Sequence, residues 1–378
     1  MGKRHVAFFI LALFSLSAFL AAAWTTKRVT NNAGQSVFPA FAVNGQNAYV
    51  AYFEGTNEDY EVYFRRSTDG GATWQAAQKL SNNSGWDEGE QLDLAINGAN
   101  VYVAWCDGSP GNAEIFFRRS IDSGATWKEV KRITTNDGPS TAPAVAASGA
   151  NVYLVWTQGF IGEDPEIFFR KSVDNGATWQ AAKRLTTNTG TSREPAVAVS
   201  GANVYVAWED NSVGNDEIYV RKSTDSGATW QNAKRLTNNT GSSSQPALAV
   251  MNANAYVAWN DGTPGNSEIY FRRSEDGGAT WKAAKRFTYT ADETLYVDLA
   301  VSGANVYAVW HDRTPGNYDL YLKKSADSGA TWAATQRLTS TAGDQGLPDL
   351  GVNATKVFVA YVDESPGNYE IYLKYSPL

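Results

Sequence analysis

Three carboxylates, Asp93, Asp298 and Asp349, recur at one position of an internally repeated sequence. Other copies carry alanine at that position, as in Pro195-Ala196. Paired carboxylates perform glycoside hydrolysis, in which one acid protonates the leaving oxygen while the other attacks or stabilises the sugar cation. The sequence does not fix the separation of these groups, so Asp93, Asp298, Asp349 and Arg193 are catalytic candidates only.

Aromatic side chains stand beside carboxylates in the two least regular copies. One copy reads Trp86-Asp87-Glu88-Gly89-Glu90, and another carries Tyr296 two residues before Asp298. An aromatic ring stacks on a sugar while neighbouring carboxylates accept hydrogen bonds from its hydroxyl groups. Oxygen-rich loops of this kind could also hold Ca²⁺, although no cofactor is expected. Solvated loop residues are the plain alternative.

Other candidates are residues that depart from the repeat. Arg193 and Arg313 stand outside the two positions at which arginine recurs in most copies. His311 shares one variable position with Cys106, and a position that accepts such unlike residues argues against a metal or nucleophilic role for either. The ligand-binding candidates are Trp86, Asp87, Glu90, Arg193, Glu194, Tyr296, His311 and Arg313.

A motif that occurs six times must position these residues. It reads Ser-x-Asp-x-Gly-x-Thr-Trp and first appears at Ser67–Trp74. The copies follow one another every 51 to 53 residues, a period typical of stacked or radial units. Their aspartates are Asp69, Asp122, Asp174, Asp225, Asp276 and Asp327.

Each repeat contains four short apolar or alternating runs bounded by Gly, Asn, Asp or Ser, which predict four antiparallel strands joined by hairpins. Both faces of the second run, Val204–Trp208 in the fourth copy, are apolar, as expected of a sheet covered on both sides. The second and third runs occur seven times, but the last copy lacks its fourth run. Residues 25–30 match that missing run. We therefore predict an all-β fold, a seven-bladed β-propeller closed by an N-terminal strand that completes the last blade.

The repeated motif resembles the Asp-box, or bacterial neuraminidase repeat, of the sialidase-like β-propellers, and the resemblance covers essentially all of residues 24–378. It implies that the boxes lie on the face opposite a catalytic mouth. The motif is itself a turn device, because Asp accepts backbone N–H groups, Gly adopts a conformation that other residues resist, and Trp packs the turn onto the blade. The six aspartates are therefore expected to be structural.

The resemblance also implies what a working sialidase requires: three arginines around the substrate carboxylate, a Tyr nucleophile activated by a Glu, and an Asp acid/base. Arginine holds a carboxylate in one orientation through bidentate contacts. Nearly all arginines here occupy two positions that recur from blade to blade, and repeated residues cannot meet at one asymmetric pocket. The Arg-Ile-Pro stretch of sialidases is replaced by Val37-Phe38-Pro39. We therefore expect no sialidase activity.

The N-terminus predicts export. Lys3 and Arg4 precede an apolar run that ends in Ala21-Ala22-Ala23, so residues 1–23 are interpreted as a secretory signal peptide, with an uncleaved anchor as the alternative. The mature chain, residues 24–378, would be a single domain without a membrane span. The expected location is extracellular, periplasmic or at the cell surface.

Composition narrows the partners. The formal net charge is −7, and the basic residues are spread over the repeats, which argues against nucleic acid. A single cysteine, Cys106, excludes an intrachain disulfide.

The leading functional hypothesis is a secreted binding or assembly module with a glycan or an extracellular protein at its central mouth. The alternatives are an exo-acting glycoside hydrolase that uses the mouth carboxylates, and a scaffold subunit. A multivalent lectin is a further alternative, because the turn Asp261–Glu268 recurs in several blades, although its residues are also those of an ordinary Asp-capped turn.

Overall fold

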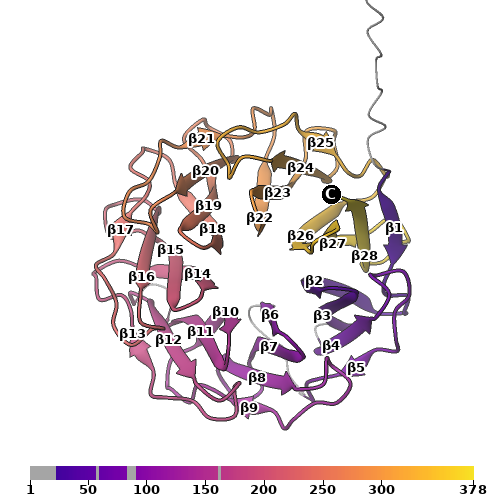
Figure 1. Ribbon diagram of the computed structural model, residues 1–378, viewed down its shortest axis with the longest axis horizontal. Coiled ribbons are helices and arrows are strands. Elements are labelled where there is room, and N and C mark those ends of the chain that lie inside the picture. The colour runs from indigo at the N-terminus through magenta and orange to yellow at the C-terminus, as the bar shows by residue number, and fades with distance from the viewer. Residues whose placement is uncertain (1–22, 57–58, 83–90, 161–162) are drawn as a thin grey trace, which may run out of the picture.

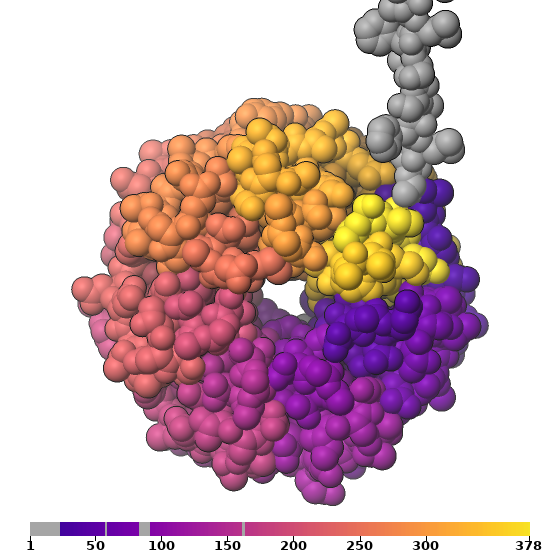
Figure 2. Space-filling view, viewed as in Figure 1, coloured from indigo at the N-terminus to yellow at the C-terminus, as the bar shows by residue number. Residues whose placement is uncertain are grey.

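The computed structural model describes residues 23–56, 59–82, 91–160 and 163–378. Within them the chain forms seven four-stranded antiparallel sheets around a central opening (Figures 1 and 2), which confirms the predicted seven-bladed β-propeller. No helix in this described part is long and apolar enough to cross a membrane. The candidates Trp86, Asp87 and Glu90, and the predicted signal segment up to residue 22, lie outside the described residues.

Each blade has four strands, which follow one another from the channel outward. The blades are numbered 1 to 7 in chain order. The innermost strands are β2 (Gln35–Asn44), β6 (Leu92–Asn97), β10 (Ser140–Ser148), β14 (Ser192–Ser200), β18 (Ser243–Met251), β22 (Thr294–Ser302) and β26 (Gln345–Val352). The second strands are β3 (Asn47–Thr56), β7 (Asn100–Asp107), β11 (Asn151–Gln158), β15 (Asn203–Asp210), β19 (Asn254–Asp261), β23 (Asn305–Asp312) and β27 (Lys356–Asp363). The third strands are β4 (Asp59–Ser67), β8 (Glu114–Ser120), β12 (Glu166–Ser172), β16 (Glu217–Ser223), β20 (Glu268–Ser274), β24 (Asp319–Ser325) and β28 (Glu370–Pro377). The outer strands are β5 (Gln78–Lys79), β9 (Lys131–Arg132), β13 (Lys183–Arg184), β17 (Lys234–Arg235), β21 (Lys285–Arg286), β25 (Gln336–Arg337) and, for blade 7, β1 (Thr25–Arg28).

The ring is closed by pairing between the two ends of the chain. Strand β1 lies antiparallel to β28, with Thr25 opposite Tyr375 and Arg28 opposite Tyr372 (Figure 1). The Arg28 guanidinium also lies 2.8 Å from the Glu370 carboxylate. The predicted closure is therefore confirmed, and β1 covers the edge of β28 that blade 7 would otherwise expose.

The second strand of each blade is buried on both faces, which explains its apolar sequence. In blade 4, the side chains of Val204 to Trp208 are at most 1% exposed. Trp208 also stacks against Tyr219 with ring centroids 5.9 Å apart. Full burial of one large apolar side chain contributes about 1.5–3 kcal/mol, so the five strand-ending tryptophans form a core spread around the ring.

The tryptophans of the repeated motif join neighbouring blades. Trp230 of blade 4 meets Phe169 of blade 3 edge to face at 5.0 Å, and Trp127 of blade 2 meets Phe64 of blade 1 in the same way at 4.8 Å. These residues were expected to hold the turn to its own blade. The structure adds a contact with the preceding blade, so each motif also fixes a blade junction.

The aspartate of each motif is held inside its turn. Asp69 accepts hydrogen bonds from the Ser67 hydroxyl at 2.7 Å and from the Thr73 N–H at 2.9 Å. These bonds favour the charged form and hold the pKa of Asp69 well below its usual range. The turn packs beside the connection between β2 and β3, where Gly70 N–H donates to the Gln46 carbonyl at 2.8 Å. That connection lies at the end of β2 away from the channel mouth described below.

The repeated arginines make contacts both between neighbouring blades and within a blade. Arg221 on β16 donates to the Leu185 carbonyl of the preceding blade. Arg235 on β17 lies 2.7 Å from the buried carboxylate of Glu217. Equivalent contacts recur around the ring, so these arginines serve the scaffold.

Candidate functional site

The beginnings of the innermost strands enclose a cavity of about 350 Å³ at one end of the channel. Seven equivalent residues, one from each blade, contribute to its lining, and we call them the mouth ring. They are Phe38, Gln91, Ala142, Glu194, Gln245, Tyr296 and Leu347. Each precedes a Pro, Leu or Val that also lines the cavity.

A backbone irregularity presents these side chains to the channel. In blade 4 the pairing of β14 with β15 shifts register between Arg193 and Ala196, so Glu194 lies in a bulge. Six members of the mouth ring have φ between 50° and 53°, namely Phe38, Ala142, Glu194, Gln245, Tyr296 and Leu347. Residues other than glycine seldom adopt this conformation, and such positions cluster at functional sites. The bulge is found in every blade except blade 2, and the side chain it displays differs in each of these six blades.

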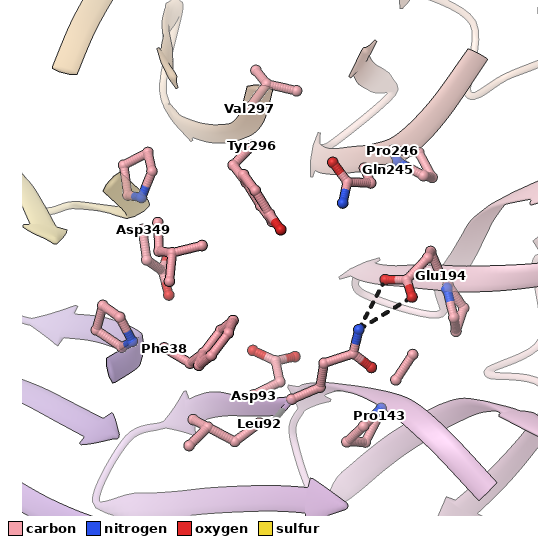
Figure 3. Close-up of a pocket in the computed structure, with 16 residues that line it drawn as sticks. Phe38, Leu92, Asp93, Pro143, Glu194, Gln245, Pro246, Tyr296, Val297 and Asp349 are labelled. Atoms are coloured by element: carbon pink, nitrogen blue, oxygen red, sulfur yellow. Dashed lines mark hydrogen bonds between the residues drawn. The ribbon is translucent and has the colours of Figure 1, made fainter. Parts of the chain in front are cut away.

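The mouth ring divides into an apolar arc and a polar arc. Tyr296, Leu347 and Phe38 come from the consecutive blades 6, 7 and 1, and form the apolar arc. The polar arc comprises Gln91, Glu194 and Gln245, from blades 2, 4 and 5. Figure 3 shows the Tyr296 hydroxyl directed toward the centre, with Phe38 on one side and Gln245 on the other. Tyr296 is 40% exposed, so its ring is available to a ligand.

One hydrogen-bonded contact in the polar arc joins two blades that have a third blade between them. The side-chain nitrogen of Gln91, in blade 2, lies 3.1 and 3.2 Å from the two carboxylate oxygens of Glu194, in blade 4 (Figure 3). The intervening blade 3 places only Ala142 at the ring. Burial raises the pKa of Glu194, and the bond from Gln91 opposes that shift.

Gln245 is held from two blades. Its N–H donates to Glu209 of blade 4 at 2.7 Å, and Asn260 Nδ2 lies 2.6 Å from its side-chain oxygen. Glu209 is 2% exposed and forms an ion pair with Arg193. Burial raises the pKa of Glu209 to about 7, while the Arg193 charge lowers it. The Nη2 atom of the same Arg193 guanidinium lies 3.3 Å from the Asp216 carboxylate. Arg193 therefore supports the polar arc from outside the cavity lining.

The three aspartates of the innermost strands connect neighbouring blades. Asp93 accepts the N–H of Leu94 in its own strand and of Val145 in the next blade, both at 2.7 Å. Asp298 repeats this arrangement with Leu299 and Leu350. Burial raises the pKa of Asp93 to about 6. These aspartates therefore have a structural role, because they join neighbouring blades through backbone N–H groups.

Two of these aspartates form a pair. Asp349 accepts the Phe41 N–H at 2.7 Å, and its carboxyl group hydrogen bonds to that of Asp298. Burial and the Asp298 charge raise the pKa of Asp349 well above its usual value. Asp93 and Asp349 border the same cavity as Tyr296, so the structure does bring together part of the predicted set.

The remaining candidates lie behind or outside the mouth. His311 is 5% exposed and stands behind Tyr296, with ring centroids 5.2 Å apart, while its other contact is a stacked Tyr318 at 4.5 Å. Burial lowers the pKa of His311 to about 4. Arg313 is exposed, and its guanidinium lies over the Tyr318 ring at 5.7 Å. Neither Arg193 nor Arg313 is among the residues that line the cavity.

The sequence analysis missed five members of the mouth ring, Phe38, Gln91, Ala142, Gln245 and Leu347. One signal was available. A proline stands near the start of the innermost strand in five of the seven copies, and the residue before it differs in each of these five. Within the described part of the chain, no group of three or more His, Cys, Asp or Glu residues is arranged to hold a metal ion.

Comparisons with known proteins agree with this architecture. The family model described as a BNR repeat-like domain matches residues 94–307. A comparison with curated protein sequences gives no match. Solved structures with the same fold include a protein of unknown function from Dyadobacter fermentans, with 15% identity, a TM-score of 0.59, and coverage of 93% of this chain and 98% of that one.

Two further structural neighbours are enzymes that act on glycans. An ulvan lyase from a polysaccharide lyase family has 12% identity and a TM-score of 0.64, over 90% of this chain and 93% of that one. Trypanosoma rangeli sialidase has 14% identity and a TM-score of 0.52, over 74% of this chain and 52% of that one. At these identities the likeness establishes a shared fold. The repeated motif, the closed seven-bladed ring and the match over more than half of the sequence place this chain in the BNR repeat-like domain family.

Proposed function

We propose that this protein is an exported binding module that takes a neutral saccharide at its central mouth. One observation carries the proposal: the residues of the mouth ring, which occupy equivalent positions in the seven blades, form an apolar arc and a polar arc. A sugar ring has the same two characters, with C–H groups on its faces and hydroxyl groups around its edge. Tyr296 and Phe38 would pack against a face, and Glu194 and Gln245 of the polar arc would bond the hydroxyl groups.

The size of the cavity fits this class of ligand. Its volume of about 350 Å³ lies at the lower end of the range for small-molecule sites, which is roughly 300–1,000 Å³. The mouth therefore suits one sugar unit or the end of a chain. Structural neighbours named as a sialidase and an ulvan lyase support glycans as the ligand class.

Charge favours a neutral saccharide over an acidic one. Among the described residues, the cavity lining contains Asp93, Glu194 and Asp349 but neither Arg nor Lys. A sugar carboxylate would meet these acidic groups without the bidentate arginine contact that such a carboxylate usually receives. This argues against sialic acid as the ligand and supports the expectation that the chain is not a sialidase.

Glycoside hydrolysis is the second candidate function, and one observation favours it. The pKa of Asp93, raised to about 6, gives the cavity wall a carboxyl group that exchanges its proton near neutral pH, as a general acid must. However, both Asp93 oxygens already accept backbone N–H groups. Binding is therefore the preferred proposal.

A glycan array with the purified protein, followed by calorimetry on the best neutral oligosaccharide, tests the proposal. We expect Tyr296→Ala to weaken binding at least about fivefold, since stacking and burial of an aromatic ring contribute about 1 kcal/mol or more. Tyr289→Ala is the matched control, because Tyr289 is 76% exposed but lies outside the mouth ring. Binding that survives Tyr296→Ala combined with Phe38→Ala would remove the mouth as the site.

A further inference from the structure

The bond between Gln91 and Glu194 is unusual because it joins two blades that are not neighbours. The single nitrogen of the Gln91 amide serves both oxygens of the Glu194 carboxylate, at 3.1 and 3.2 Å. A carboxylate offers two side-by-side acceptors and is best satisfied by two donors. Glu194, the one carboxylate of the mouth ring, therefore has a single donor nitrogen for its two oxygens.

The two partners differ in how firmly they are held. Glu194 sits in the bulge with φ of 50°, between Pro195 and Arg193, and Arg193 is fixed by ion pairs to Glu209 and Asp216. Gln91 precedes β6, and the contact between its side chain and Glu194 crosses the channel wall above Ala142. Glu194 is therefore the fixed partner, and the Gln91 amide is the one that can swing away.

Ala142 provides the room for an incoming group. It is the smallest member of the mouth ring and lies in the blade between the two partners. A ligand that enters above Ala142 meets Glu194 from the side now occupied by the Gln91 amide. The carboxylate only accepts hydrogen bonds, so the entering group must present donors.

We propose that Glu194 selects saccharides with a vicinal diol, and that the Gln91 amide occupies the place of that diol in the ligand-free protein. Two adjacent hydroxyl groups match two adjacent carboxylate oxygens, with one charge-assisted hydrogen bond each. The inference rests on the proposed saccharide-binding function and adds the chemical feature that the mouth selects. It makes Glu194 a specificity-determining residue and Gln91 an internal competitor.

The probes are the methyl glycosides of galactose, glucose, mannose and rhamnose, together with their monodeoxy derivatives, with affinities from ligand-observed NMR. For the glycoside that binds best, we expect loss of either hydroxyl of the recognised diol to weaken binding about tenfold, and Glu194→Gln to do the same. On the Glu194→Gln background, the same deoxy change should cost less than about twofold, because the two changes remove one interaction.

The Gln91→Ala variant tests whether Gln91 competes with the ligand for Glu194 or simply contacts the ligand. If Gln91 occupies the diol site, its removal frees Glu194 and tightens binding, by about threefold or more if the bonded state dominates. Gln245→Ala is the matched control from the same ring position, and it should weaken binding without changing the cost of the deoxy substitutions. Thermal unfolding of each variant checks that the propeller is intact.

The outcomes distinguish this inference from the proposed function. If Tyr296→Ala abolishes binding but the deoxy derivatives lose the same factor in Glu194→Gln as in the wild type, saccharide binding stands and the diol inference is overturned. Weaker binding by Gln91→Ala would also overturn it. If no glycoside and no arrayed neutral glycan binds the wild type, both proposals fall together.

Discussion

The carboxyl groups of Asp298 and Asp349 hydrogen bond to each other at the junction of blades 6 and 7, inside the channel. Asp349 reaches on to the Phe41 N–H of blade 1, and Asp298 accepts the Leu350 N–H of blade 7. The pair thus spans the sector in which the ring closes. Two buried carboxyl groups in contact cannot both be charged at low cost, so they share a proton.

Asp349→Asn should stabilise the protein at neutral and alkaline pH. Because the folded-state pKa of Asp349 is raised, the unfolded chain loses this proton first, and wild-type stability falls as pH rises above the ordinary carboxyl pKa near 4. Asparagine keeps an oxygen for the Phe41 N–H and donates to Asp298 without needing a proton. We expect a gain of ~1–2 kcal/mol in the free energy of unfolding at pH 8, measured by denaturant titration. Lower stability of the variant at pH 8 would contradict the shared proton.

Asp93→Asn should have the opposite effect at the same position of another blade. Both oxygens of Asp93 accept backbone N–H groups, from Leu94 and Val145. Asparagine offers one oxygen and turns an NH₂ group toward the second N–H, which leaves buried donors facing each other. We expect a loss of about 1–3 kcal/mol in the free energy of unfolding at pH 7. Equal effects of Asp93→Asn and Asp349→Asn would show that the two sites do not differ in protonation.

His311→Phe should remove an acid-dependent loss of stability. Burial holds the pKa of folded His311 near 4, whereas the unfolded side chain titrates near 6.5, so the unfolded state binds the proton first as pH falls. The folded wild type should therefore lose about 2–3 kcal/mol from this group between pH 6.5 and pH 4. Phenylalanine keeps the ring contacts with Tyr296 and Tyr318 and does not titrate.

The measurement for His311→Phe is the difference in unfolding free energy between variant and wild type at pH 7.5, 6 and 5. That difference isolates His311 from Asp344, whose charge faces it, and from the channel aspartates, whose raised pKa values act in the opposite direction. A difference that stays constant over this range would mean that the imidazole is not held neutral by burial.

The architecture was predictable because it repeats. The seven occurrences of the second and third strand runs predicted the blade count, and the match of residues 25–30 to the outer strand of other blades predicted the closing strand. A propeller needs only local hairpins and two apolar faces, both of which leave periodic patterns in the sequence.

The mouth was less predictable because its members are selected by a bulge. Tyr296 and Glu194 were found by their chemistry, but Phe38 and Gln245 look like ordinary strand residues until the register shift presents them to the channel. Arg193 looked like a ligand residue because it broke the repeat. Its charge is instead paired with Glu209, which lies directly opposite Arg193 in the adjacent strand, so the contact follows from the register of the β14–β15 hairpin.

Deletion of residues 24–30 should unfasten the ring, since β1 supplies the outer strand of blade 7. The loss removes the β1–β28 pairing, the buried Val29 and the partner of the Glu370 carboxylate. A bare β28 edge is also a template for pairing between molecules. We expect the melting temperature to fall by roughly 10 °C, with concentration-dependent association. A chain that starts at Trp24 is the control and should melt like the full protein. If the truncated chain stays monomeric and melts within a few degrees of this control, the contact between the chain ends is not what holds the seven blades together.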